Sequence, residues 1–224
     1  MNIKSLMTSV ICNAITVFVI FLSGAELRAA GDSFLFDAYV KLDVEAETAV
    51  KKAQAWLAET QRSDGAWHSS YGINTGVAAF ATMALMVNGS VPGEGPYGKE
   101  VGKGLQFLLN SQKESGLIVA DPKSNAPMYQ HALATIALAE MYGMTENPRI
   151  RSSLINAVNL IVDVQDNGGG WRYQPIPSPG DISATVMQVM ALRAASDAGI
   201  YVPEETVTRA IKFVRKCYNV KEKG

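Results

Sequence analysis

The sequence predicts an all-α protein built from pairs of helices, with half-polar outer helices around strongly apolar inner ones. Three observations lead to this prediction. A short loop motif recurs at a period of a little over 50 residues, an amphipathic helix pattern precedes each copy, and an almost wholly apolar helix pattern follows it. No stretch with the two-residue alternation of a strand competes with these helices.

The composition is that of a folded domain with a sizeable core and a balanced charge. Of the 224 residues, 48 % are hydrophobic and 18 % charged, with 20 Lys and Arg against 21 Asp and Glu. This excludes intrinsic disorder and gives no electrostatic support for a nucleic-acid partner. Two Cys and two His are too few for a disulfide scaffold or a structural zinc site, so we expect no metal and no cofactor.

The N-terminus has the pattern of a signal peptide. Lys4 precedes an apolar run at about residues 10–22, and Ser23 and Ala25 are the small residues that a signal peptidase requires. We therefore expect residues 1–25 to be removed and the protein to be exported, to the periplasm or the extracellular space. The alternative is an uncleaved helix that anchors the chain, so membrane association is compatible with the sequence but not required.

After a lead-in at residues 26–47, residues 48–224 contain the repeats. The shared loop pattern is Gln-x3-Gly-x-Trp, with spacings of 51 and 53 residues between the glutamines, and the middle copy has Ile118 in place of Trp. The loop residues are Gln61, Gly65, Trp67, Gln112, Gly116, Gln165, Gly169 and Trp171. Glycine can end a helix in a left-handed conformation, Gln can bond a neighbouring helix, and Trp can bury a large surface while donating its N–H. We therefore expect these loops to be structural.

The helices can be placed around the loops. The first outer helix is expected to bury Ala46, Ala49, Val50, Ala53, Trp56 and Leu57 and to turn Lys51, Lys52, Gln54 and Glu59 to water. The inner helices are predicted at residues 77–87, 128–141 and 182–195. A fourth outer helix follows at about residues 207–214 without an inner partner. The prediction is therefore seven main helices, about three and a half pairs, with an exposed apolar lateral face.

The loops, with the stretches at residues 168–173 and 180–185, resemble the repeats of squalene-hopene cyclases and protein prenyltransferases. The resemblance covers about residues 48–224. It implies an α/α toroid around an apolar chamber, which is incomplete here because such toroids have five to seven helix pairs. The chain is then a fragment of a longer product, or its open end is capped or paired in another way.

The resemblance also identifies the residues that catalysis requires. Cyclases of this family protonate an alkene with an Asp-x-Asp-Asp motif at the start of an inner helix. The matching stretch begins with Asp181, but Ser183 and Ala184 replace the other two acids. Asp181 is therefore expected to be a helix N-cap that stays ionised. The zinc set of the prenyltransferases is absent, because Cys217 and His131 lie on different helices far apart in sequence.

The favoured function is an exported, non-catalytic toroid that binds an apolar, isoprenoid-like ligand or a protein partner. Candidate lining residues are Phe80, Met83, Tyr129, His131, Tyr173, Asp181 and Met187, although a histidine in an apolar helix is more often a satisfied core residue. One alternative is a fragment of a cyclase or transferase whose catalytic acid lies outside this chain. Another is a polysaccharide lyase with an α/α toroid, for which Arg172 beside Tyr173 is the suggestive pair.

Overall fold

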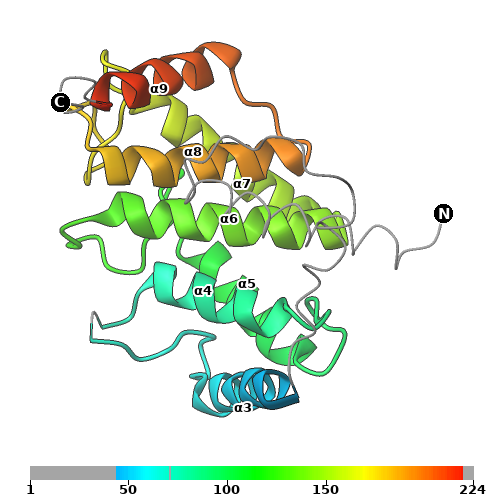
Figure 1. Ribbon diagram of the computed structural model, residues 1–224. Helices are drawn as coiled ribbons and strands as arrows, with labels where there is room; N and C mark the ends of the chain where they lie inside the picture. The colour runs from blue at the N-terminus through cyan, green and yellow to red at the C-terminus, as the bar shows by residue number, and fades with distance from the viewer. Residues whose placement is uncertain (1–43, 71, 219–224) are drawn as a thin grey trace, which may run out of the picture. The chain divides into compact units, whose positions relative to one another are not determined.

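The computed structural model describes residues 44–70 and 72–218 (Figure 1), and this part of the chain is all-helical, as predicted. It contains seven α-helices and only isolated β-bridges outside them. The helices are α3 (Val44–Thr60), α4 (Thr75–Met86), α5 (Gly98–Asn110), α6 (Pro127–Thr145), α7 (Pro148–Asp163), α8 (Ile182–Asp197) and α9 (Glu204–Cys217). The predicted signal peptide and nearly all of the predicted lead-in lie outside the described residues.

Three helices form an inner layer, and α5, α7 and α9 pack behind it. The inner helices α4, α6 and α8 lie side by side in chain order, with α4 against α6 and α6 against α8 (Figure 1). The outer helix α5 packs on α4, α7 packs on α6 and α8, and α9 packs on α8. This alternation of inner and outer helices is compatible with an α/α toroid. The arrangement concerns the compact unit at Thr48–Gly224, which is separate from the unit at Met1–Glu47.

The helices begin and end where local chemistry dictates. The inner helix α4 begins two residues earlier than predicted because the side chain of Asn74 caps it, accepting hydrogen bonds from the N–H groups of Gly76 and Val77. Proline occupies the first turn of α6 and of α7, where its missing N–H costs no hydrogen bond. The helix α6 extends to Thr145 and ends at Glu146, which has a left-handed conformation with a φ of 51°.

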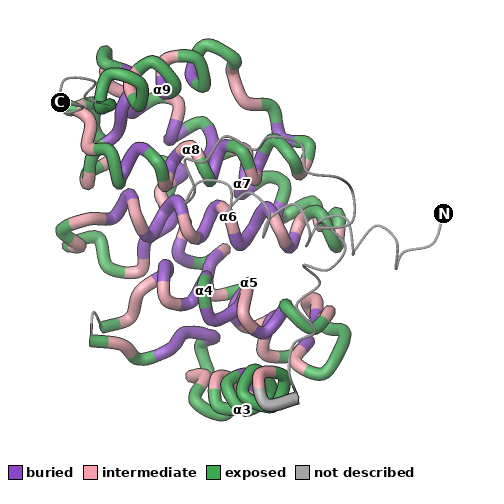
Figure 2. Tube along the Cα trace, viewed as in Figure 1, coloured by how far each residue is buried: buried purple, intermediate pink, exposed green. Residues whose placement is uncertain are grey.

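The first outer helix differs from its prediction. Its expected water-facing residue Gln54 is buried, whereas the expected core residue Trp56 is 60 % exposed. Gln54 precedes its loop glutamine by the same number of residues as the buried Leu105 and Val158 precede theirs. It can occupy this core position because its amide donates to the carbonyl of Ala84 and accepts from the side chain of Asn88. Figure 2 shows the resulting surface of α3, which is mostly exposed.

The outer helices end before the loop glycines. They stop at Thr60, Asn110 and Asp163, and the loop glycines follow in a tight turn rather than at the helix ends.

None of the helices in the two described ranges is both long enough and apolar enough to cross a lipid bilayer.

Candidate functional site

The loop glutamines connect successive outer helices. Each glutamine Nε2 donates one hydrogen bond to the carbonyl of the glycine four residues later. Its second hydrogen bond goes to a carbonyl of the next outer helix: Gln61 to Glu100 (2.9 Å), Gln112 to Ser153 (2.9 Å) and Gln165 to Thr206 (3.0 Å). The same two bonds thus occur in all three loops, and each loop fastens its own repeat to the outer helix that follows.

The loop glycines lie directly against the next outer helix. Gly65, Gly116 and Gly169 have φ values of 90°, 90° and 92°. A Cβ atom on any of them would lie 2.2 to 2.3 Å from a main-chain oxygen of that helix, at Lys103, Asn156 and Arg209 respectively. Glycine is required at these three places by the positive φ and by the close approach together.

The loop tryptophans are core residues. Trp67 is 4 % exposed and Trp171 is 1 % exposed. Their Nε1 atoms donate to the carbonyls of Leu57 (2.8 Å) and Ile161 (2.7 Å), in the outer helix that precedes each loop. The indole therefore satisfies a helix carbonyl while it fills the space beneath the loop. Ile118 takes the same place in the middle loop and is fully buried.

Four polar side chains meet at the amino-terminal ends of α6 and α8. The Ser183 hydroxyl donates to Asp181 Oδ1 (2.6 Å) and accepts from the Tyr129 hydroxyl (2.5 Å). The Tyr173 hydroxyl donates to Asp181 Oδ2 (3.3 Å), and the two tyrosine rings stack with their centroids 6.0 Å apart. The loop before α8 is held here because the Met128 N–H donates to the Tyr173 carbonyl. We call these four residues the tyrosine–aspartate cluster.

The electrostatics of this cluster keep Asp181 ionised. The Ser183 hydroxyl, followed by the N–H of Ala184 at the start of α8, lowers the pKa of the Asp181 carboxyl. The Asp181 charge in turn raises the pKa of Tyr173, over whose ring the Arg172 guanidinium carbon lies at 5.5 Å from the centroid. At neutral pH the cluster therefore contains the Asp181 carboxylate and the protonated phenol of Tyr173. It can offer hydrogen bonds to a ligand, but Asp181 has no proton to give to an alkene.

His131 does not line a surface or a pocket, which corrects one of the candidate positions. The ring is fully buried, its Nδ1 accepts from the Ile118 N–H (3.0 Å), and its Nε2 lies 3.2 Å from the Ala157 carbonyl. Burial lowers the pKa of the ring to about 4, so it is neutral. In the next repeat Thr185 takes the place of this histidine as acceptor, because its hydroxyl accepts a hydrogen bond from the main-chain N–H of Trp171 (3.0 Å).

The remaining lining candidates lie on the inner helices and are partly open to solvent. Phe80 on α4 is 58 % exposed, and Met83 on α4 and Met187 on α8 are half-buried. Four half-buried residues of α6 recur every three or four positions and therefore share one face of the helix: Tyr129, Leu133, Ile136 and Glu140. Leu133 and Ile136 were not among the sequence candidates, although their spacing from Tyr129 already places them on its face.

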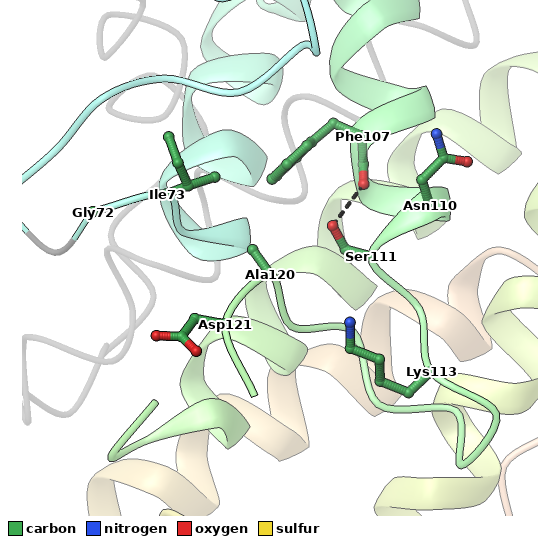
Figure 3. A pocket seen from close by; sticks show the side chains of 8 residues that line it. All are labelled: Gly72, Ile73, Phe107, Asn110, Ser111, Lys113, Ala120 and Asp121. Carbon is green, nitrogen blue, oxygen red and sulfur yellow. Dashed lines mark hydrogen bonds between the residues drawn. The ribbon is translucent and has the colours of Figure 1, made fainter. Parts of the chain in front are cut away.

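One open pocket is found away from these residues. It has a volume of about 360 Å³ and lies beside the carboxyl-terminal end of α5 (Figure 3). Lys113 and Asp121 are the charged residues that line it, and Phe107 contributes an aromatic ring. None of the candidate residues from the sequence lines this pocket.

The described residues contain no group of three or more His, Cys, Asp or Glu side chains that could hold a metal ion. Cys217 is exposed on α9, whereas His131 is enclosed in the core.

Comparison with known proteins finds a distant relationship. No family model matches the chain. The chain is similar to lanosterol synthase erg7A of Aspergillus fumigatus, with 31 % identity over 145 residues, which is 59 % of this chain. The match covers 18 % of that enzyme, so the chain spans less than a fifth of the length of the curated relative it matches. This similarity supports a relationship to the class of squalene cyclase-like helical proteins.

Proposed function

We propose that this chain is an exported, non-catalytic relative of the squalene cyclases that binds an apolar, isoprenoid-like ligand on its inner helices. The observation that carries the proposal is the line of partly exposed aromatic and aliphatic side chains on α4, α6 and α8, which ends at the tyrosine–aspartate cluster. Apolar surface with a few polar groups at one end suits an isoprenoid with a single hydroxyl or a similar head group.

The proposal that the chain is not a catalyst depends on Asp181. A cyclase needs a strongly acidic, protonated carboxyl group within an apolar chamber. Here the two neighbouring positions of the motif hold Ser183 and Ala184, and the hydrogen bonds of both residues favour the ionised form of Asp181. A cyclase or transferase fragment whose acid lies outside this chain is the alternative, and further repeats with an Asp-x-Asp-Asp motif encoded beyond codon 224 would favour it.

Methionine methyl groups provide a direct test of ligand binding. In the full chain with 13C-methyl methionine, addition of farnesol should shift the signals of Met83 and Met187, which are half-buried on α4 and α8. The signals of Met128 and Met141 should stay in place, because both side chains are fully buried in the core. Unchanged signals at Met83 and Met187 at saturating farnesol would contradict ligand binding on this face.

A matched pair of variants tests the location. Phe80→Ser should weaken farnesol binding by about tenfold, because it removes one large exposed ring from the binding face. Trp56→Ser, which removes an equally exposed ring from α3, should leave the affinity unchanged. If the two variants bind farnesol equally well, the apolar face binds a protein partner instead or is not a binding site.

The tyrosine–aspartate cluster does not favour the function of a polysaccharide lyase. Such an enzyme needs a basic group to remove a proton from its substrate. The raised pKa of Tyr173 keeps its hydroxyl protonated, and its proton is directed to Asp181.

A further inference from the structure

The last outer helix exposes a stripe that its counterparts bury. Val207, Ile211 and Val214 on α9 are 37 %, 46 % and 37 % exposed. The loop hydrogen bonds align the outer helices with one another. The carbonyl of Thr206 accepts from a loop glutamine, just as the carbonyls of Glu100 and Ser153 do on the earlier helices. The residues that correspond to the stripe are all buried: Val101, Leu105 and Leu108 on α5, and Leu154, Val158 and Ile161 on α7.

The earlier stripes are covered because an inner helix follows each of them. Contacts join α5 to α6 and α7 to α8, in addition to the inner helix that precedes each outer one. Among the described residues no helix follows α9. The neighbouring surface of α8 is apolar as well, since Ile182, Val186 and Met190 are exposed on it. Beside one another, α8 and α9 thus expose six large apolar side chains among the described residues, and exposed apolar patches often mark interaction sites.

Charges flank the stripe in a self-complementary order. The first turn of α9 holds Glu204 and Glu205, and the last turn holds Arg215 and Lys216. Glu204 and Arg215 are three turns apart and lie within about 20° of each other around the helix, on the same side of the stripe. Neither is part of a salt bridge within the described chain. When two such helices lie antiparallel, the acidic first turn of each faces the basic last turn of the other.

We propose that two copies of this chain associate through α9, with the two helices antiparallel about a two-fold axis near Ile211. In this arrangement Val207 of one copy lies opposite Val214 of the other, and Ile211 packs near the axis. Glu204 of each copy lies opposite Arg215 of the other, so two ion pairs border the apolar contact. A two-fold, isologous contact of this kind is the commonest way in which identical chains associate. The proposal is independent of ligand binding.

Sedimentation equilibrium of the full chain tests the contact. The wild-type chain should form dimers at micromolar concentration, and Ile211→Asp should raise the dissociation constant by at least about a hundredfold, because a carboxylate would enter the apolar contact twice. Ile211 is exposed, so this change leaves the core intact. Trp56→Asp, at the opposite end of the helical array, should have no effect. A monomeric wild-type chain, or dimers that survive Ile211→Asp, would overturn the proposal, and sensitivity to Trp56→Asp would indicate head-to-tail association instead.

Charge reversal tests the antiparallel order. Glu204→Arg and Arg215→Glu should each weaken self-association by about tenfold, because each replaces two attractive pairs by two repulsive ones. A mixture of the two variants should form heterodimers of about wild-type affinity, since every pair across the axis is then of opposite charge. If the mixture associates no better than either variant alone, Glu204 and Arg215 do not face each other and the proposed order is wrong.

Discussion

Gln165 is joined to Thr206 by a buried hydrogen bond of 3.0 Å, which links the third loop to the last outer helix. The other proton of the same amide goes to the carbonyl of Gly169 at 2.9 Å. Both donors of the side chain are thus used on main-chain carbonyls, whereas its oxygen has no partner within the described chain. Gln165 therefore stabilises the fold through the two N–H groups of its amide, and substitutions can test this.

Replacing Gln165 by Met should lower the free energy of unfolding by about 1–3 kcal/mol, because two buried carbonyls lose a hydrogen bond at nearly constant side-chain volume. Gln165→Glu should cost more, since a buried carboxylate would face two carbonyl oxygens. Urea unfolding measures both. Gln106→Glu on the exposed surface of α5 is the control and should stay within about 0.5 kcal/mol of wild type. A harmless Gln165→Glu would show that the amide donors are not needed.

Truncation of the loop tryptophan should destabilise the fold much more than truncation of the helix tryptophan. Trp171→Ala should lower the free energy of unfolding by about 3–5 kcal/mol, because the buried indole leaves a cavity and an unpaired carbonyl at Ile161. Trp56→Ala should change it by less than about 0.5 kcal/mol, since that ring is largely exposed. Thermal or urea unfolding measures both variants. Equal effects would mean that Trp171 is not a core residue.

His131 should make stability depend on pH. Its pKa is about 4 in the folded chain and about 6.5 when unfolded, so only the unfolded state binds a proton between these values. Stability should therefore be complete above pH 6.5 and decrease as the pH is lowered towards 4, by about 3 kcal/mol over the whole window. Urea unfolding at a series of pH values measures this slope.

The control for this pH dependence comes from the chain itself. His131→Thr, which copies the acceptor found at Thr185, should remove most of the slope, whatever its effect on stability at pH 7. An identical slope in the wild type and in His131→Thr would assign the pH dependence to carboxyl groups instead.

The helices could be predicted from the sequence because the outer helices have a strong apolar periodicity and the inner ones are almost wholly apolar. Their boundaries required the caps: Asn74 extends α4 to an earlier start than its apolar run indicates. The burial of Gln54 could not be predicted, because a polar residue enters a core position only when partners such as the Ala84 carbonyl and Asn88 are present. Those partners lie some thirty residues further along the chain.

The tyrosine–aspartate cluster was not predicted as a unit. Tyr129, Tyr173 and Asp181 were expected near the chamber, but the position of Ser183 between Tyr129 and Asp181 depends on the contact of α6 with α8. Phe80 and Tyr129 were proposed as lining residues mostly from the resemblance to the family. His131 could not be placed, because the direction in which a side chain of an all-apolar helix points depends on which neighbour covers each face.

Export is tested by the mature N-terminus. If residues 1–25 are a cleaved signal peptide, the secreted or periplasmic protein should begin at Glu26, which N-terminal sequencing or mass spectrometry of the purified protein detects. An intact Met1 in a membrane fraction would indicate the anchored alternative.

The central claim is that the chain does not convert a polyene, and incubation with squalene tests it most directly. The purified full chain is incubated with squalene, and the extract is analysed by gas chromatography and mass spectrometry, with Asp181→Asn in parallel. Because the pKa of Asp181 is lowered and Ser183 and Ala184 stand where the motif has acids, squalene should be recovered unchanged from both samples. A cyclised product that forms with the wild-type chain and disappears in Asp181→Asn would contradict the account.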